Sequence, residues 1–179
     1  AFAEVWYFVR APRRDQVEEI YERLIDVAKG AALMTGTTFK IDFLTGCYEV
    51  LINDALADVM WESMQKVGVP QFEEKEFEFA RKLAESFDKS MVEGLRNSPE
   101  FQDCPELREQ ILNTTLVPPR GKGKSGGGST DVGDVSWIVP TVQMSAATSP
   151  IGTPGHSWQN FASSGSSIGH KGMLVAAKA

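Results

Sequence analysis

The chain has few cysteines and histidines, two residue types that often form metal and nucleophile sites. Its 179 residues include two cysteines and two histidines, and its formal net charge is −6. Cys47 and Cys104 form no CxxC or similar motif, so we expect two structural thiols in a reducing compartment, although a disulfide between them stays open. The acidic excess removes the electrostatic case for binding nucleic acid.

Long apolar runs are also missing. No stretch approaches the ~20 residues of a membrane helix, and no signal-peptide pattern stands at the start, so we expect a cytoplasmic protein without membrane contact. The first residues, AFAEVWYFVR, already have a strand pattern, and the last, GMLVAAKA, have no helix-ending glycine or proline. We therefore expect the chain to be a fragment of a longer protein.

Periodicity predicts the elements. Apolar alternation predicts strands over residues 1–10 and 37–52, with a helix over 17–31 between them, an order typical of half a small α+β layer. A capped helix is expected from Asn53 or Asp54 to Gly68, a second with an apolar stripe over 77–91, and a shorter one over 105–113. A strand is predicted over 135–145, and a last helix beginning near His170.

A glycine-rich stretch, PPRGKGKSGGG at 118–128, interrupts this pattern. Its GKS is not a phosphate loop, because Pro118 stands where that motif needs glycine and no good strand precedes it. We interpret the stretch as a surface loop whose Arg120, Lys122 and Lys124 could contact an anionic ligand or partner.

The residues suited to chemistry gather in 129–171. His156, in GTPGHSW, follows a predicted strand on a Pro/Gly turn, which favours metal ligation or acid–base work, although a lone histidine is more often structural. Asp131 and Asp134, in TDVGDVS, could bind a metal or act as acid and base. Aspartate beside glycine more often orders its own turn, so we interpret Asp134 as structural and leave Asp131 open.

The segment SSGSSIGHKG allows two interpretations. Its N–H groups and hydroxyls at a helix start, with Ser167 and His170, could seat a substrate carboxylate. Simple capping by Ser166 or Ser167 explains the same residues. From the residues alone, neither interpretation is favoured.

Six motifs together resemble the M20 metallopeptidase/amidohydrolase family, in its aminobenzoyl-glutamate utilisation protein B branch: AEVWYFVRAP, GAALMTGT, GCYEVLIN, STDVGDVSWIVPT, GTPGHSW and SSIGHKGM. The resemblance implies an α/β fold of two domains, with a catalytic domain over a two-metal site of zinc or manganese. An inserted α+β (ferredoxin-like) lid domain also mediates dimerisation. Residues 1–52 would belong to this lid, and residues 53–179 would form the C-terminal part of the catalytic domain.

The resemblance also implies a reaction, hydrolysis of the amide bond in N-acyl amino acids such as aminobenzoyl-glutamate or in related dipeptides. A metal-bound water attacks the carbonyl while a glutamate shuttles the proton. His156 matches the family's last metal-ligating histidine, Asp131 matches a loop at the active site, and Ser167 and His170 match a segment near the substrate. The catalytic glutamate and the other ligands precede Ala1 in this family, so we expect the isolated chain to be inactive, with its metal absent or partial.

Two alternatives remain. The chain could be a truncated, non-catalytic paralogue that serves as a dimerisation or carboxylate-binding module. It could also be a plain α/β module whose loops bind a carboxylate without chemistry. The resemblance implies an N-acyl amino acid as ligand and a homo- or hetero-oligomer formed through the lid.

Overall fold

The computed structural model describes residues 2–119 and 130–179, and the chain divides into two compact units. Unit 1 comprises Ala1–Asn53 with Gly121–Thr141, and unit 2 comprises Asp54–Arg120 with Val142–Ala179. The loop residues Arg120, Lys122 and Lys124 lie outside the described residues. These units do not test the assignment to a lid and a catalytic domain, which stays a prediction.

Unit 1 is built around one long helix, α1 (Arg14–Thr35). It begins in a capping box in which Gln16 Oε1 accepts a hydrogen bond from the N–H of Arg13 at 3.2 Å. It ends at Gly36, whose φ of 62° is the left-handed conformation that glycine adopts readily. The predicted helix over 17–31 is confirmed and extends further at both ends, although none of its residues is buried.

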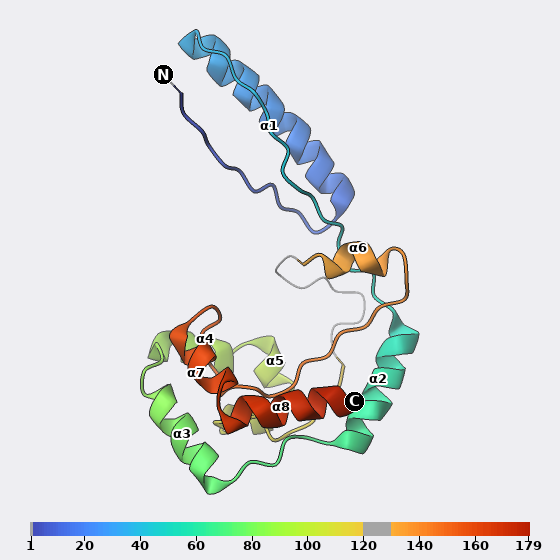
Figure 1. The fold of residues 1–179 in the computed structure, drawn as a ribbon, viewed down its shortest axis with the longest axis vertical. Coiled ribbons are helices and arrows are strands. Elements are labelled where there is room, and N and C mark those ends of the chain that lie inside the picture. The colour runs from blue at the N-terminus through green and yellow to red at the C-terminus, as the bar shows by residue number, and fades with distance from the viewer. Residues whose placement is uncertain (1, 120–129) are drawn as a thin grey trace. The chain divides into compact units, whose positions relative to one another are not determined.

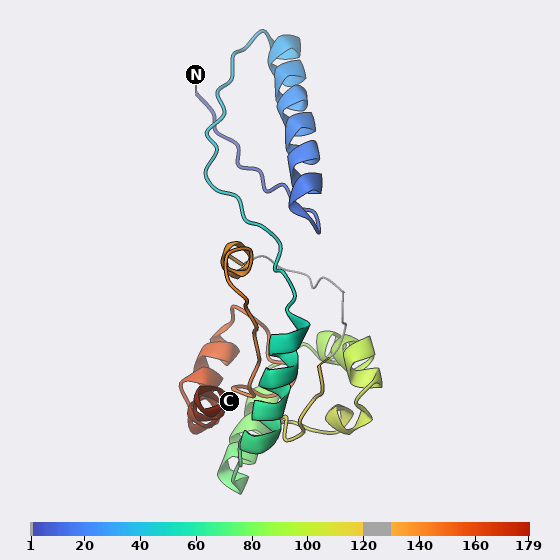
Figure 2. The same cartoon turned by 90° about the vertical axis from the view of Figure 1, so that its right-hand side faces the viewer.

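Two extended segments, 2–11 and 37–53, run along α1 (Figures 1 and 2). Neither forms a hydrogen-bonded strand within the described ranges. Their apolar side chains stay in solvent, with Phe2 90% and Phe8 79% exposed. A β-strand needs a neighbour to accept and donate its backbone hydrogen bonds. The strands predicted over 1–10 and 37–52 are therefore not formed here, and the α/β class stays a prediction.

A short helix, α6 (Val132–Ser136), is hydrogen-bonded to the second extended segment of unit 1. Asp134 Oδ1 accepts from the N–H of Tyr48 at 2.9 Å, and Ser136 Oγ accepts from the N–H of Leu51 at 2.8 Å. Asp134 thus has a structural role, but it stabilises a segment far away in sequence rather than its own turn.

The strand predicted over 135–145 is wrong, because residues 135 and 136 belong to α6 and residues 137–145 form no strand either. Trp137, the next residue, donates from Nε1 to the carbonyl of Glu49 at 2.9 Å, and its ring lies 5.1 Å from that of Tyr48. Gly133 allows this close packing, since a Cβ there would lie 1.9 Å from the Tyr48 carbonyl oxygen. Asp134, Ser136 and Trp137 therefore all bond to the segment from Tyr48 to Leu51.

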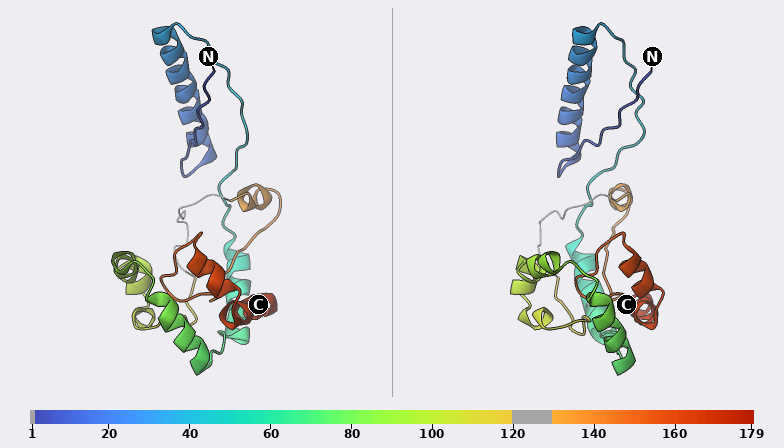
Figure 3. Two further views of the ribbon diagram at one scale, coloured as in Figure 1. Left: turned by 60° about the vertical axis from the view of Figure 1, so that its left-hand side comes forward. Right: turned by 90° about the vertical axis from the view of Figure 1, so that its left-hand side faces the viewer.

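Unit 2 is formed by short helices, two of which, α7 and α8, follow one another across a sharp turn (Figure 3). Its helices are α2 (Asp54–Val67), α3 (Glu74–Ala84), α4 (Lys89–Arg96), α5 (Pro99–Gln102), the 3-10 helix η1 (Pro105–Arg108), α7 (Trp158–Ser164) and α8 (Ser167–Lys178). As predicted, α2 ends at Gly68, which has a φ of 78°.

The single helix expected over 77–91 is in fact two helices, α3 and α4. Asp88 separates them, because its Oδ1 accepts from the N–H groups of Ser90 and Met91 at 2.8 and 3.2 Å and starts a new helix. The helix expected over 105–113 is limited to η1. At Asp88, local hydrogen bonding prevailed over the apolar periodicity.

The core of unit 2 consists of two small clusters. Ala80, Leu112 and Ile168 are fully buried, and Phe101, Cys104 and Leu107 form the second cluster. Cys104 is buried and free, and Cys47 is exposed and free, so the structure has no disulfide between them. Within the described ranges, no helix is long and apolar enough to cross a bilayer.

Two glycine substitutions test the packing of unit 1. Gly133→Ala should destabilise the chain by about 2 kcal/mol or more, because the new methyl group would collide with the backbone of Tyr48. Gly30→Ala is the matched control inside α1, where no atom of the described residues would lie within 4 Å of the new methyl group, and it should stabilise by about 0.5–1 kcal/mol. Urea unfolding monitored by tryptophan fluorescence measures the free energy of unfolding of both variants. Equal effects would show that α6 does not pack on Tyr48.

Candidate functional site

His156 lies on the turn that leads into α7, and its side chain is exposed. Among the non-glycine residues that the structure describes, it alone has a positive φ, 53°. The next residue holds the turn in place: Ser157 Oγ donates to the Pro154 carbonyl at 2.6 Å and accepts from the Asn160 N–H at 3.2 Å. A histidine in the left-handed region on a hydrogen-bonded turn is a sparsely populated arrangement of the kind that concentrates at functional sites.

Ser167 and His170 lie in the first turn of α8, and both are exposed. The helix is capped by Ser166, whose Oγ accepts from the N–H of Ile168 at 3.2 Å and donates to the carbonyl of Ser163 at 2.6 Å. The capping expected from Ser166 or Ser167 is thus confirmed for Ser166. The helix begins three residues before His170, and the tight turn expected before it is shared between the end of α7 and the start of α8.

The glycines of this segment have a packing role that the sequence analysis missed. A Cβ on Gly169 would lie 2.2 Å from the carbonyl oxygen of Ser164, and one on Gly172 would lie 2.3 Å from that of Ala147. The buried Ser163 also donates from Oγ to the Thr148 carbonyl at 3.1 Å. Close backbone packing therefore accounts for the spacing of the two glycines without any ligand.

Lys171, the neighbour of His170, makes the strongest polar contact of α8. Its Nζ lies 2.6 Å from Glu76 Oε2 on α3 and 3.9 Å from Glu73 Oε1. The side chain of Glu76 is only 1% exposed, whereas that of Lys171 is 29% exposed. Glu76 Oε2 also accepts from the N–H of Glu73 at 2.7 Å. This ion pair fixes the start of α8 against α3.

The environment of Glu76 changes its acidity strongly. Burial by itself raises the pKa of the carboxyl, but hydrogen bonds from Lys171, the Ser167 side chain and the Glu73 N–H outweigh burial and lower the pKa to about 2. The carboxylate is thus ionised inside the unit. Sequence reasoning missed it, although a signal was present, because Glu76 lies on the same helical face as the buried Ala80 and Leu83 at positions i, i+4 and i+7.

The structure brings only some of the predicted site residues into one unit. His156, Ser167 and His170 lie in unit 2, at the starts of the two mutually packed helices α7 and α8, whereas Asp131 lies in unit 1. An exposed imidazole on an ordered turn suits a metal ligand. Across residues 2–119 and 130–179, however, no group of three or more His, Cys, Asp or Glu side chains could hold a metal. Among the described residues, His156 therefore has no further His, Cys, Asp or Glu side chains grouped with it as metal ligands.

Stability should depend on pH through Glu76. Its pKa in the folded chain, about 2, lies below the ordinary 4.5, so its stabilisation is fully present above about pH 4.5 and is lost as the pH falls from there toward 2. The loss should be on the order of 3 kcal/mol at most. Urea unfolding at a series of pH values should show this slope in the parent and a flatter one in Glu76→Gln. Glu78→Gln, at an exposed position of α3, serves as control; an identical slope in all three proteins would contradict the assignment.

Removing the side-chain charge of Lys171 should leave the Glu76 carboxylate buried without a neighbouring cation. Lys171→Met should therefore destabilise the chain by about 2–4 kcal/mol, while Lys178→Met, at an exposed position of the same helix, should have little effect. The double variant Glu76→Leu/Lys171→Met should recover much of the loss, because no unpaired charge remains. Additive losses in this double-mutant cycle would show that the two groups do not interact.

Comparison with known proteins gives one extensive match. The chain is 36% identical to the B-type subunit of p-aminobenzoyl-glutamate hydrolase from Escherichia coli (strain K12), over 99% of this chain and 38% of that protein. The chain thus spans well under half the length of this relative. No protein-family model and no solved structure matches it. The aligned region includes all six motifs, and it confirms the resemblance to the aminobenzoyl-glutamate branch: nearly the whole chain is similar to part of that p-aminobenzoyl-glutamate hydrolase subunit.

Proposed function

We propose that the chain is part of a metal-dependent amidohydrolase that cleaves the amide bond of N-acyl amino acids such as aminobenzoyl-glutamate, or of related dipeptides. One observation carries the proposal: the chain aligns almost end to end with a p-aminobenzoyl-glutamate hydrolase subunit. His156 supports the proposal in two ways. By the resemblance it matches the family's metal-ligand position, and in the structure its side chain is exposed on a turn where its φ is positive.

Within this proposal the residues have separate roles. His156 supplies one imidazole ligand to a divalent metal, zinc or manganese, and the remaining ligands and the catalytic glutamate come from parts of a complete two-metal enzyme outside this chain. Such a metal would supply Lewis-acid polarisation of the amide carbonyl and an activated water. Asp131 borders the active site on its loop. No residue of this chain acts as the catalytic acid or base, so the chain by itself is inactive.

Ser167 and His170 are proposed to contact the substrate. Both are exposed in the first turn of α8, where the helix dipole favours a carboxylate, and both belong to the same packed pair of helices as the His156 turn. The ion pair between Lys171 and Glu76 would hold this turn in position. It leaves the His170 side chain exposed, whereas the Ser167 hydroxyl also bonds to the Glu76 carboxylate and would exchange that partner for the substrate.

The proposed architecture assigns residues 1–52 to the lid and dimerisation domain and residues 53–179 to the catalytic domain of an α/β fold. The exposed apolar side chains of unit 1 favour pairing with another protein surface, and the relative is itself called a subunit. The same exposed side chains are the observation that favours the second candidate, a non-catalytic dimerisation module.

A chimaera tests the proposal: residues 1–179 replace the aligned part of the matching subunit in the E. coli hydrolase. We expect it to hydrolyse p-aminobenzoyl-glutamate. His156→Ala should lower its metal content and abolish turnover, because a ligand is lost. His170→Ala is the matched control at the other exposed histidine; it should raise KM and leave the metal content unchanged. Asp134→Ala should mainly lower stability, since Asp134 binds the Tyr48 N–H.

Metal analysis by mass spectrometry and steady-state kinetics separate the outcomes. If the chimaera is folded and active but His156→Ala keeps its full metal content and near-normal turnover, the ligand assignment is wrong. A folded chimaera that does not hydrolyse the substrate, yet still forms the oligomer of the parent enzyme, would favour the dimerisation module instead.

A further inference from the structure

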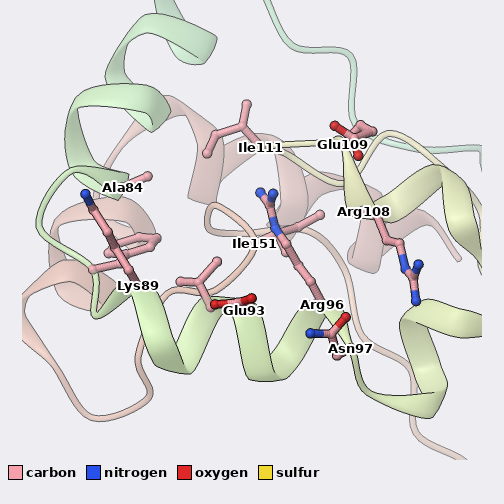
Figure 4. A pocket seen from close by; sticks show the side chains of 11 residues that line it. Ala84, Lys89, Glu93, Arg96, Asn97, Arg108, Glu109, Ile111 and Ile151 are labelled. Carbon is pink, nitrogen blue, oxygen red and sulfur yellow. The ribbon is translucent and has the colours of Figure 1, made fainter.

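Unit 2 contains a pocket of about 500 Å³ that none of the four predicted site residues lines (Figure 4). Its volume lies in the range of small-molecule sites. Apolar side chains from three parts of the unit form much of its wall: Phe87, Val92, Ile111 and Ile151. A ligand with an apolar body would therefore find contacts there.

Two arginines give this pocket its polar character. Arg96 comes from α4 and extends toward Ile111, and Arg108 comes from η1 (Figure 4). In each guanidinium the Nε is buried, and among the residues that the structure describes it has no hydrogen-bond partner. A buried donor without an acceptor is rare in folded proteins, because it has lost its water without gaining a replacement. Two guanidinium groups with unsatisfied hydrogen-bond donors beside one pocket favour an anionic ligand there.

The charges of the pocket point to an anion. Lys89, Arg96 and Arg108 line it together with two carboxylates, Glu93 and Glu109, so the cations are in excess by one. Neither carboxylate forms a salt bridge with Arg96 or Arg108 in the part of the chain that the structure describes. The planar guanidinium fork fits carboxylate and phosphate groups equally well.

We propose that this pocket binds a small organic anion, with its oxyanion head at Arg96 and Arg108 and its apolar body against Phe87, Val92, Ile111 and Ile151. The oxyanion accepts hydrogen bonds from the guanidinium groups of the two arginines and offsets their positive charge. This site goes beyond the proposed amide hydrolysis, since it uses none of the residues assigned to metal or substrate there.

Hexanoate is a suitable probe because it combines a carboxylate with an apolar chain, whereas acetate and inorganic phosphate offer the head alone. The measurement is arginine Nε–Hε NMR on the unmutated chain. Hexanoate should shift the Arg96 and Arg108 signals saturably and bind more tightly than acetate or phosphate. The signal of Arg23, on α1 in unit 1, should not move. Absence of a saturable shift at the two arginines, or an equal shift at Arg23, would overturn the proposal.

Variants give a second, independent measurement by calorimetry. Arg96→Met and Arg108→Met should each weaken hexanoate binding roughly 10- to 100-fold, the usual effect of losing a charged hydrogen bond. Without ligand, the melting temperature of each variant should not fall, because an unsatisfied buried donor has been removed. Arg23→Met is the control and should bind as the parent does. Hexanoate affinity that is unchanged in both pocket variants would show that the arginines do not hold the ligand.

Discussion

Unit 2 depends most on one ion pair, that of Glu76 on α3 with Lys171 on α8. A carboxylate that is only 1% exposed is unfavourable by itself, and it is accommodated because Lys171 and the Glu73 N–H both donate to Oε2. The pair also sets the rotation of α8 about its axis. Ile168 faces the core with Ala80 and Leu112, and Ser167 and His170 face outward. The residues proposed to contact substrate are thus displayed as a consequence of how the helix is fixed.

Close backbone packing complements this ion pair. Gly169 and Gly172 bring α8 against the end of α7 and against the segment at Ala147, and Ser163 adds a hydrogen bond to Thr148. The turn that carries His156 directly precedes α7, so the packing of α7 against α8 also fixes the position of this turn. Display of polar side chains from a rigid pair of helices is the arrangement that precise ligand geometry requires.

The features that could be predicted from the sequence are those that depend on interactions between residues close together in the chain. The helix over 17–31, the end of α2 at Gly68 and the cap at Ser166 all follow from periodicity and capping residues, and the structure contains them. Tertiary interactions could not be predicted in this way. The helix at residues 132–136 depends on hydrogen bonds to residues 48 and 51, which a periodic pattern does not encode. The helical face of α3 indicated that Glu76 is buried, but its ion pair with Lys171, 95 residues further on, could not be predicted. The break at Asp88 is local, and there capping hydrogen bonds compete with the apolar periodicity. The predicted strands need hydrogen-bonding neighbours, and pattern alone does not supply them.

The central claim is that this chain gives one imidazole, His156, to a metal centre completed by other parts of an amidohydrolase. The most direct measurement is a metal-loaded crystal structure of the E. coli hydrolase that carries residues 1–179 in place of its own aligned segment. The account predicts a ring nitrogen of His156 at about 2.0–2.1 Å from a bound divalent metal. A fully occupied metal site whose ligands all come from elsewhere, with His156 turned to solvent, would contradict it.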